Sequence, residues 1–267
     1  MFGFFTKRPN ITIDMSKTER TWEHFGKTNP YFAVSTFDKF KNEHLDESAL
    51  REFFDSGEAF IERVWKEIET NFETDFLPQK ALDFGCGVGR LTLAMAKRCG
   101  QVTGIDISEK MLELARNNVD RMNLENVNFV KSEVDCAKDI GEFDFIQSFI
   151  VLQHIKPKIG EAIFFKIVKM LAQNGIGVVH FTYSNLKSSL AQKIRVKLYR
   201  DFPLTYKLRN FILKKENNPF MPIYLYDVNR LLNILQENGC HKCLIRFSQH
   251  GAEGAILFFQ KHEEILY

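Results

Sequence analysis

The sequence lacks a long hydrophobic run: none of its apolar stretches approaches the roughly 20 residues that a membrane-spanning helix needs. The opening residues, MFGFFTKRPN, are apolar only at their start, and their charges follow the apolar part, whereas a secretory signal carries its charges in front. We therefore expect a cytoplasmic protein.

Cysteine is also scarce, and the net charge is small. The five cysteines are odd in number and scattered, which suits a reducing compartment better than a disulfide framework. Cys240 and Cys243 form a single C-x-x-C pair without a second pair or a set of histidine partners, so we expect no metal site. The formal net charge of +2 by itself indicates no acidic or basic partner, and no recognition motif for nucleic acid is present, so no nucleic-acid partner is expected.

Short apolar runs alternate with amphipathic helical patterns from residue 80 onward. Strands are predicted at 80–84, 101–105, 127–131, 143–149, 175–182, 243–249 and 255–260. Helices are predicted to begin after Ser108, a typical N-cap, at Pro157, which suits the first helical position, and after Asp227. This alternation favours an α/β fold with a seven-stranded, mostly parallel sheet, and the short link HGAEG makes the last strand antiparallel.

The residues before this alternation follow a different pattern. Residues 1–75 are predicted to form a helical lid or cap, and residues 76–267 a core. Within the first part, residues 50–69 place apolar side chains at three-to-four spacing, which is typical of an amphipathic helix. Gly57 is a candidate interruption of that helix.

Three glycines directly follow the first predicted strand, in the stretch ALDFGCGVGR. Gly85, Gly87 and Gly89 give up side chains between an apolar strand and an apolar helix, which is typical of a turn that lets a ligand approach the backbone. A tight turn without a ligand is the alternative. Asp106 ends the next strand, where a carboxylate can accept hydrogen bonds from two ribose hydroxyls, or favour a helix N-terminus.

The spacing of the glycines is G-x-G-x-G, whereas a dinucleotide fingerprint is G-x-G-x-x-G, so a nicotinamide-dependent oxidoreductase is disfavoured. With Asp83 at the strand end, this spacing resembles the class I S-adenosylmethionine-dependent methyltransferases. The resemblance covers residues 80–184 and 227–260 and includes the stretches VTGIDISEKMLELAR and FDFIQSFIVLQHI. It implies a Rossmann-like sheet with a reversed last strand, S-adenosylmethionine as the cofactor, and methyl transfer as the reaction.

The resemblance also assigns cofactor contacts. The assigned positions are Asp83, Gly85, Cys86, Gly87, Gly89, Asp106, Ile107, Glu133, Val134 and Ser148. Asp83 would help to hold the methionine amino group, Asp106 the ribose hydroxyls, and Ile107 would lie against the adenine. The family usually has an aspartate after the third strand, where this chain has Glu133, with Asp135 as a possible substitute.

A hydroxyl acceptor needs a base, and His154 follows the fourth strand at the edge where an acceptor is expected. A loop histidine that only shapes the pocket is the alternative. Tyr31, Tyr183 and Tyr224 are candidate acceptor-binding residues, although ordinary aromatic packing also explains them. The expected function is O-methylation of a small-molecule or glycan acceptor; an N-methyltransferase and a non-catalytic cofactor-binding module remain alternatives.

Residues 186–225 interrupt the alternation as a basic insertion before the final helix. They carry nine lysines and arginines against Asp201 and Glu216, interleaved with apolar residues. In the family that the chain resembles, an insertion at this place tends to cover the acceptor pocket. Three interpretations stay open: a solvated cap, a basic amphipathic surface that meets an anionic membrane or a lipid-linked glycan, and a nucleic-acid contact.

Overall fold

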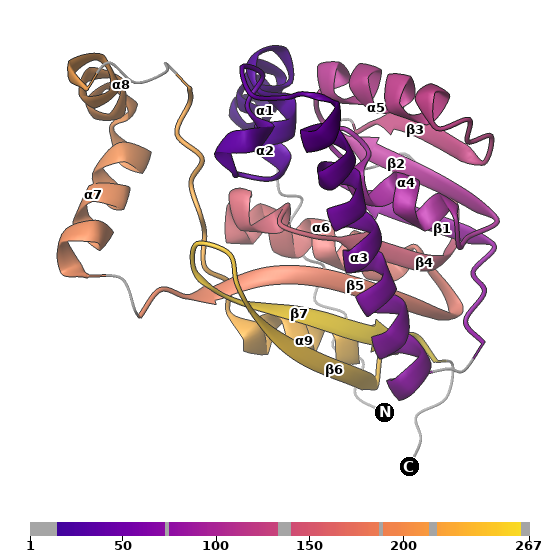
Figure 1. Cartoon of the computed structure of the whole chain (residues 1–267). Coiled ribbons are helices and arrows are strands. Elements are labelled where there is room, and N and C mark those ends of the chain that lie inside the picture. Colours follow the sequence, from indigo (N-terminus) through magenta and orange to yellow (C-terminus); the bar gives the residue numbers. More distant parts are fainter. Residues whose placement is uncertain (1–14, 73–74, 133–139, 187–188, 214–217, 263–267) are drawn as a thin grey trace.

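A seven-stranded sheet runs through the centre of the molecule (Figure 1). The structure is a computed structural model that describes residues 15–72, 75–132, 140–186, 189–213 and 218–262. The strands are β1 (Lys80–Phe84), β2 (Gln101–Asp106), β3 (Val127–Lys131), β4 (Phe143–Ser148), β5 (Leu171–Ser184), β6 (Lys242–Gln249) and β7 (Glu253–Gln260). They lie in the order β3-β2-β1-β4-β5-β7-β6, and β7 is antiparallel to both of its neighbours. The predicted fold class, with its reversed last strand, is thus confirmed.

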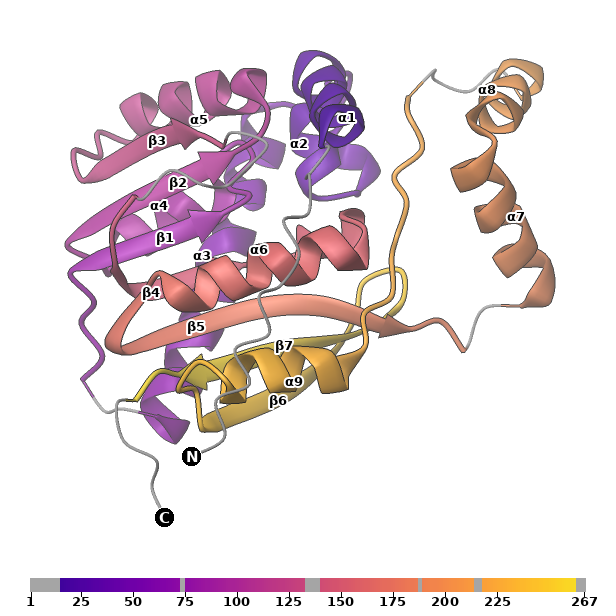
Figure 2. The same ribbon diagram turned by 180° about the vertical axis from the view of Figure 1, so that it is seen from behind.

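Helices cover both faces of this sheet. The described helices of the chain are α1 (Ser16–Thr28), α2 (Pro30–Val34), η1 (Asp38–Phe40), α3 (Glu47–Asn71), α4 (Arg90–Ala96), α5 (Glu109–Arg121), η2 (Leu152–His154), α6 (Pro157–Lys169), α7 (Leu190–Asp201), α8 (Pro203–Ile212) and α9 (Val228–Gln236). Helices α3, α4 and α5 lie on one face and α6 and α9 on the other, as the two opposite views show (Figures 1 and 2). No described helix is both long enough and apolar enough to cross a membrane.

The predicted helix starts are confirmed by their caps. The Ser108 hydroxyl accepts a hydrogen bond from the Met111 amide at 3.2 Å, and the Asp227 carboxylate accepts one from the Asn229 amide at 2.9 Å. Pro157 occupies the first turn of α6, where its missing N–H costs nothing.

Two details differ from the predicted pattern. Strand β5 begins at Leu171, before the predicted 175, because Leu171 pairs with Phe143 across an irregularity in the β4–β5 ladder. Helix α3 continues through Gly57 without interruption, and a side chain at this position would collide with the Arg90 carbonyl at the start of α4. Gly57 is therefore a close-packing position between two helices.

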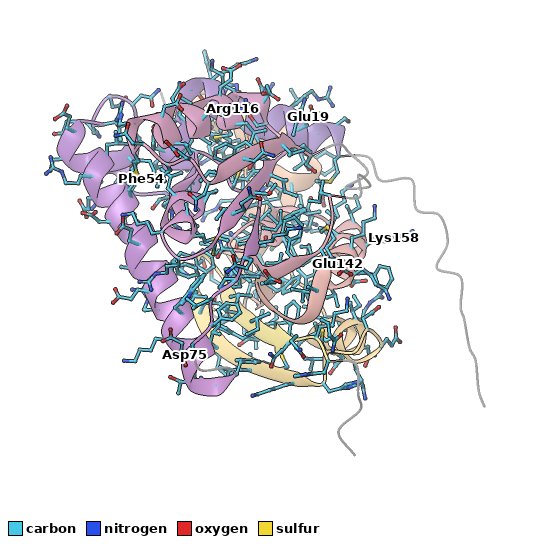
Figure 3. The ribbon with its side chains drawn as sticks, turned by 90° about the vertical axis from the view of Figure 1, so that its right-hand side faces the viewer. Glu19, Phe54, Asp75, Arg116, Glu142 and Lys158 are labelled. Atoms are coloured by element: carbon cyan, nitrogen blue, oxygen red, sulfur yellow. The ribbon has the colours of Figure 1, made fainter. Side chains whose placement is uncertain are left out.

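The N-terminal helices are divided between the core and the carboxyl edge of the sheet. Trp65 of α3 packs edge-to-face on Phe145 of β4, with ring centroids 4.9 Å apart, so α3 belongs to the central core. Helices α1 and α2 lie near the carboxyl ends of the strands (Figure 1). Glu19 of α1 and Arg116 of α5 are seen at the same end of the molecule, opposite Asp75 (Figure 3). Helices α7 and α8 project from the body beyond this edge (Figure 2).

Candidate functional site

The glycine turn connects β1 to α4 at the carboxyl edge of the sheet. Gly85 and Gly87 have φ values of 78° and 54°, in the left-handed region that favours glycine. A Cβ at Gly85 would collide with the Val151 side chain, and one at Gly87 would lie 2.8 Å from Val34 Cγ2. Any ligand on this turn must therefore take the place of these two valine side chains. Gly89 differs in its role, because it is the N-cap of α4 and a Cβ there would lie 2.6 Å from Leu93 Cδ1.

Asp106 lies beside this turn at the end of β2. Its two carboxylate oxygens accept hydrogen bonds from the Gly87 and Ser108 amides, each at 2.9 Å. Burial raises the pKa of Asp106 to about 6, although these amide hydrogen bonds oppose the shift. The carboxylate is therefore ionised at neutral pH, and each oxygen keeps a lone pair that can accept a hydrogen bond from a hydroxyl.

A cavity of about 100 Å³ lies between the glycine turn and α1, which we call the nucleoside cavity. Its lining includes Gly85, Gly87, Asp106 and Ile107, four of the residues predicted to hold a cofactor. Cavities that hold small molecules and cofactors typically measure about 300–1,000 Å³, so this one must widen to take a nucleoside.

A smaller cavity lies on the other side of Gly85 and is lined by Asp83, Cys86 and Arg90. The Asp83 carboxylate accepts hydrogen bonds from Thr92 Oγ1 at 2.6 Å and from Gln147 Nε2 at 2.9 Å, and burial raises its pKa. Both cavities share Val34 and Gly85 in their linings. A ligand longer than a nucleoside can therefore extend from one cavity into the other once Val34 moves.

Arg90 is a site residue that the sequence analysis did not assign. Burial lowers the pKa of its guanidinium to about 10, and its Nε has no hydrogen-bond partner among the described residues. Its Nη1 donates to Ser56 Oγ at 3.2 Å. The only signal in the sequence is a cation directly after the third glycine, and that signal does not reveal that the Nε is buried without a partner.

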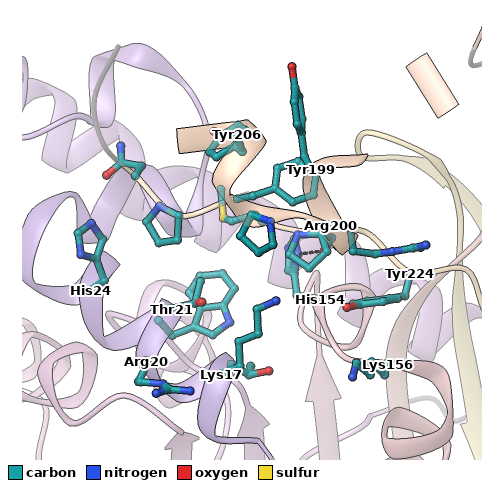
Figure 4. Close-up of a pocket in the computed structure, with 18 of the residues that line it drawn as sticks. Lys17, Arg20, Thr21, His24, His154, Lys156, Tyr199, Arg200, Tyr206 and Tyr224 are labelled. Atoms are coloured by element: carbon teal, nitrogen blue, oxygen red, sulfur yellow. Dashed lines mark hydrogen bonds between the residues drawn. The ribbon is translucent and has the colours of Figure 1, made fainter. Parts of the chain in front are cut away.

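A third cavity, of about 800 Å³, opens between α1 and the α7–α8 segment, and we call it the acceptor cavity (Figure 4). Met15, Thr18 and Trp22 line both this cavity and the nucleoside cavity. Helix α1 is therefore the wall between them. The sequence analysis predicted a lid but did not single out Trp22, because an aromatic residue on a helix face is also typical of ordinary packing.

His154 lines the acceptor cavity, as predicted for a base (Figure 4). Its Nδ1 lies 2.8 Å from the Pro222 carbonyl oxygen, which can only accept, so Nδ1 carries the proton. Its Nε2 lies 3.1 Å from Gln153 Nε2 and accepts from that amide. Burial lowers the pKa of His154, so the imidazole is neutral at neutral pH, and its Nε2 lone pair can take a proton once the hydrogen bond from Gln153 is released.

The three candidate tyrosines lie in different surroundings. Tyr224 lines the acceptor cavity together with His154. Tyr31 is buried and donates to Asn118 Oδ1 at 3.1 Å, and it lines neither the nucleoside cavity nor the acceptor cavity. The ring centroid of Tyr183 lies 6.2 Å from that of Phe247, and Tyr183 also lines neither the nucleoside cavity nor the acceptor cavity.

The predicted contact at Ser148 lies outside the lining of the nucleoside cavity. The Ser148 hydroxyl is buried and donates to the Phe84 carbonyl at 3.0 Å, which ties β4 to β1. Glu133 and Val134 lie outside the described residues.

Comparison with known protein sequences points to methyl transfer. A family model described as a methyltransferase domain matches residues 81–175. The ubiquinone biosynthesis O-methyltransferase of Psychrobacter arcticus is 34% identical over 187 residues, which cover 67% of this chain and 68% of that relative. The enzyme of the same name from Psychrobacter cryohalolentis is 26% identical over equal shares.

Solved structures share the fold. Magnesium protoporphyrin IX methyltransferase from Synechocystis PCC 6803 with bound S-adenosylhomocysteine has a TM-score of 0.61 at 18% identity, covering 93% of this chain and 100% of that one. An N-methyltransferase from Bradyrhizobium japonicum in complex with the same compound has a TM-score of 0.57 at 14% identity, covering 92% and 99%. At these identities the similarity concerns the fold.

Proposed function

The chain belongs to the class I S-adenosylmethionine-dependent methyltransferases, and from that premise we propose that it methylates a hydroxyl of a small-molecule or glycan acceptor. Two observations support oxygen as the methylated atom. The relatives that are 34% and 26% identical are both named O-methyltransferases. A neutral histidine, His154, lies in the acceptor cavity, and a hydroxyl needs such a base more than a neutral amine does.

The residues around the two smaller cavities fit S-adenosylmethionine. Asp106 offers an ionised carboxylate to the two ribose hydroxyls, and Ile107 offers an apolar surface to the adenine. Gly85 and Gly87 provide the surface that a Cβ would block. On the other side of Gly85, Asp83 suits the methionine amino group, and the Arg90 guanidinium suits the methionine carboxylate.

The cofactor, when bound, supplies an electrophilic methyl group on a sulfonium. The protein's own residues align the acceptor and manage its proton, and such alignment provides much of the acceleration in this kind of displacement. His154 Nε2 would take the proton that the acceptor hydroxyl loses when the methyl group passes to its oxygen from the sulfonium sulfur, whose bond to that carbon breaks. The Pro222 carbonyl holds the proton on Nδ1 and so keeps Nε2 free of one.

A single observation carries this proposal: Trp22 of α1 lines both the nucleoside cavity, which contains Asp106, and the acceptor cavity, which contains His154, and so forms the wall between them. The direct test is a thermal-shift panel with S-adenosylhomocysteine and NAD⁺, followed by transfer of a labelled methyl group to phenolic and sugar acceptors. Stabilisation by S-adenosylhomocysteine alone supports the cofactor site. Cofactor binding without transfer to any acceptor supports the alternative of a non-catalytic module, and transfer to an amine supports N-methylation.

We also propose that the α7–α8 segment contacts an anionic membrane surface. Both helices expose apolar side chains at helical spacing, and none of the residues of α7 is buried. The exposed apolar residues are Leu190, Ile194, Val196 and Leu198 on α7 and Leu204, Leu208, Phe211 and Ile212 on α8. Cations lie between them, and a basic amphipathic helix is typical of an interfacial segment.

Co-sedimentation with vesicles tests this contact. We expect the protein to pellet with phosphatidylglycerol vesicles at low salt, less so at high salt, and not with phosphatidylcholine vesicles. The variant Leu208→Ser/Phe211→Ser should remain in the supernatant. The absence of salt-sensitive pelleting would leave this segment as a cap over the acceptor cavity.

A further inference from the structure

The acceptor cavity gathers positive charge from four parts of the chain. Its lining includes Lys17 and Arg20 of α1, Lys156 before α6, Arg200 of α7 and Lys207 of α8. Among the described residues of that lining Asp201 is the one carboxylate, so these residues have a net charge of +4 with the histidines neutral, whereas the whole chain has +2. Figure 4 labels Lys17, Arg20, Lys156 and Arg200 around the opening, with Lys17 and Arg20 on one side and Arg200 on another.

Most of these cations form no ion pair in the part of the chain that the structure describes, although Lys17 lies close enough to Asp201 to lower the pKa of that carboxyl group. Arg200 Nε pairs with Asp201 Oδ1 at 2.9 Å, which accounts for the one acid. Within the described ranges, Lys17, Lys156 and Lys207 form no ion pair, and Arg20 has only a hydrogen bond from its Nε to the Ser16 carbonyl at 3.3 Å. Like charges that lie close together repel one another, so gathering cations in one cavity costs free energy. Cations that only keep a surface solvated can be spread apart and do not have to meet in one cavity. This convergence indicates an anionic ligand.

From this charge we infer that the acceptor is an anion: a small molecule that bears a phosphate or carboxylate group in addition to the hydroxyl that is methylated. The inference rests on the proposed function, because it assigns the substrate class of the same site. The cations of the cavity would hold the anionic group and so orient the hydroxyl toward His154.

An aromatic cluster in the same cavity indicates the rest of the molecule. The rings of Tyr199, Tyr206 and Phe220 lie 5.2 to 5.9 Å apart between centroids, and all three line the cavity. Trp22 adds a fourth ring on the opposite side, from α1. Aromatic side chains such as these favour an acceptor that contains an aromatic ring, which can pack against them.

The charge also suits the chemistry of His154. A nearby positive charge favours the ionised form of an acceptor hydroxyl and so lowers its pKa. Burial lowers the pKa of His154, which makes this histidine a weak base. A weak base is sufficient where the pKa of the acceptor hydroxyl is already lowered. A hydroxyl on an aromatic ring, with cations nearby, meets this condition.

The test measures phenyl phosphate and phenol binding by calorimetry to the full chain saturated with S-adenosylhomocysteine. We expect phenyl phosphate to bind at least tenfold more tightly than phenol, and benzoate also to bind more tightly than phenol. Raising the salt should weaken the two anions and leave phenol unchanged, because their attraction to the cations is screened.

Variants then locate the anion. Lys17→Gln, Lys156→Gln and Lys207→Gln should each weaken phenyl phosphate binding about threefold, and the triple variant at least tenfold, as expected for exposed charge pairs. Lys158→Gln is the matched control: Lys158 is exposed, is two residues from Lys156, and lies outside the cavity lining (Figure 3). It should bind phenyl phosphate as the unaltered chain does, and all variants should bind S-adenosylhomocysteine with unchanged affinity.

The outcomes separate the two proposals. If S-adenosylhomocysteine binds and phenyl phosphate binds no more tightly than phenol, or the lysine variants behave as Lys158→Gln does, the anionic acceptor is wrong and the proposed function stands. If S-adenosylhomocysteine itself does not bind, the proposed function fails first.

Discussion

The indole of Trp22 meets the imidazole of His154 edge-to-face, with ring centroids 5.5 Å apart, and Trp22 also lines the cavity that contains Asp106. Methyl donor and acceptor must come into contact for transfer, so this wall must move when the site fills. The nucleoside cavity of about 100 Å³ requires the same movement, since a nucleoside needs more room.

The first prediction concerns this movement. S-adenosylhomocysteine should change the tryptophan fluorescence of the protein in a saturable way, because Trp22 borders the nucleoside cavity, whereas Trp65, the other tryptophan, is buried in the core. In Trp22→Phe the fluorescence change should disappear while binding persists by calorimetry. A change of equal size in that variant would assign the signal to Trp65 and contradict a moving α1.

The second prediction concerns the glycine turn. Gly87→Ala should weaken S-adenosylhomocysteine binding at least tenfold, because the added Cβ occupies the surface that the cofactor needs. Gly141→Ala is the matched control: Gly141 also has a positive φ, of 94°, but its Cβ would meet nothing within 4 Å. Both variants should lose stability from backbone strain, of about 1 kcal/mol, in chemical denaturation. If Gly141→Ala binds as weakly as Gly87→Ala, the effect is one of stability and not of the site.

The third prediction concerns pH. Burial raises the pKa of Asp106 to about 6, so the carboxyl group becomes protonated as the pH falls through 6 and loses its charge for the ribose hydroxyls. The affinity for S-adenosylhomocysteine should fall about tenfold between pH 7 and pH 5.

The stability contribution of Asp106 has the opposite sign. Its pKa is raised on folding, so the ionised form destabilises the native state above pH 6, and this cost is relieved as the pH falls from 6 toward 4. Protonation of Asp106 at pH 5 therefore does not unfold the protein, and unfolding through this group cannot explain weaker binding. An affinity that does not change over this range would contradict the carboxylate as a ligand.

The fourth prediction concerns the base. His154→Ala should lower kcat about 100-fold or more for a hydroxyl acceptor and leave the affinity for S-adenosylhomocysteine unchanged. His24→Ala is the control, because His24 also lines the acceptor cavity but comes from α1 and is not the predicted base. This variant should keep kcat close to that of the unaltered enzyme. Burial lowers the pKa of His154, so kcat of the unaltered enzyme should rise with pH and reach its plateau at a lower pH than it would with a histidine of ordinary pKa. An unaltered kcat in His154→Ala would remove the base role.

The sequence predicted the sheet and the glycine turn well, because both depend on local pattern. Ser108, Pro157 and Asp227 occupy the helix starts expected of them, and the short link after β6 leaves an antiparallel pairing as the one option. Gly85 and Gly87 line the nucleoside cavity together with Asp106, although they lie about twenty residues from it in the chain.

The remaining features depend on contacts between distant residues, which a local pattern does not contain. Gly57 looked like a helix interruption, but its missing side chain makes room for the Arg90 carbonyl. Tyr31 was a candidate acceptor-binding residue, but its hydroxyl donates to Asn118, from α5, inside the core. The wall at Trp22 and the buried Nε of Arg90, which lacks a partner among the described residues, likewise follow from how α1 and α3 pack on the core.

The most direct measurement is calorimetric titration of Asp106→Ala with S-adenosylhomocysteine, compared with Asp144→Ala. Both carboxylates accept hydrogen bonds from two backbone amides, Asp106 at the carboxyl edge of the sheet and Asp144 at the start of β4. We predict at least tenfold weaker binding in Asp106→Ala, because two hydroxyls lose a charged acceptor, and unchanged binding in Asp144→Ala. Equal affinities in the two variants would contradict the cofactor site at the glycine turn.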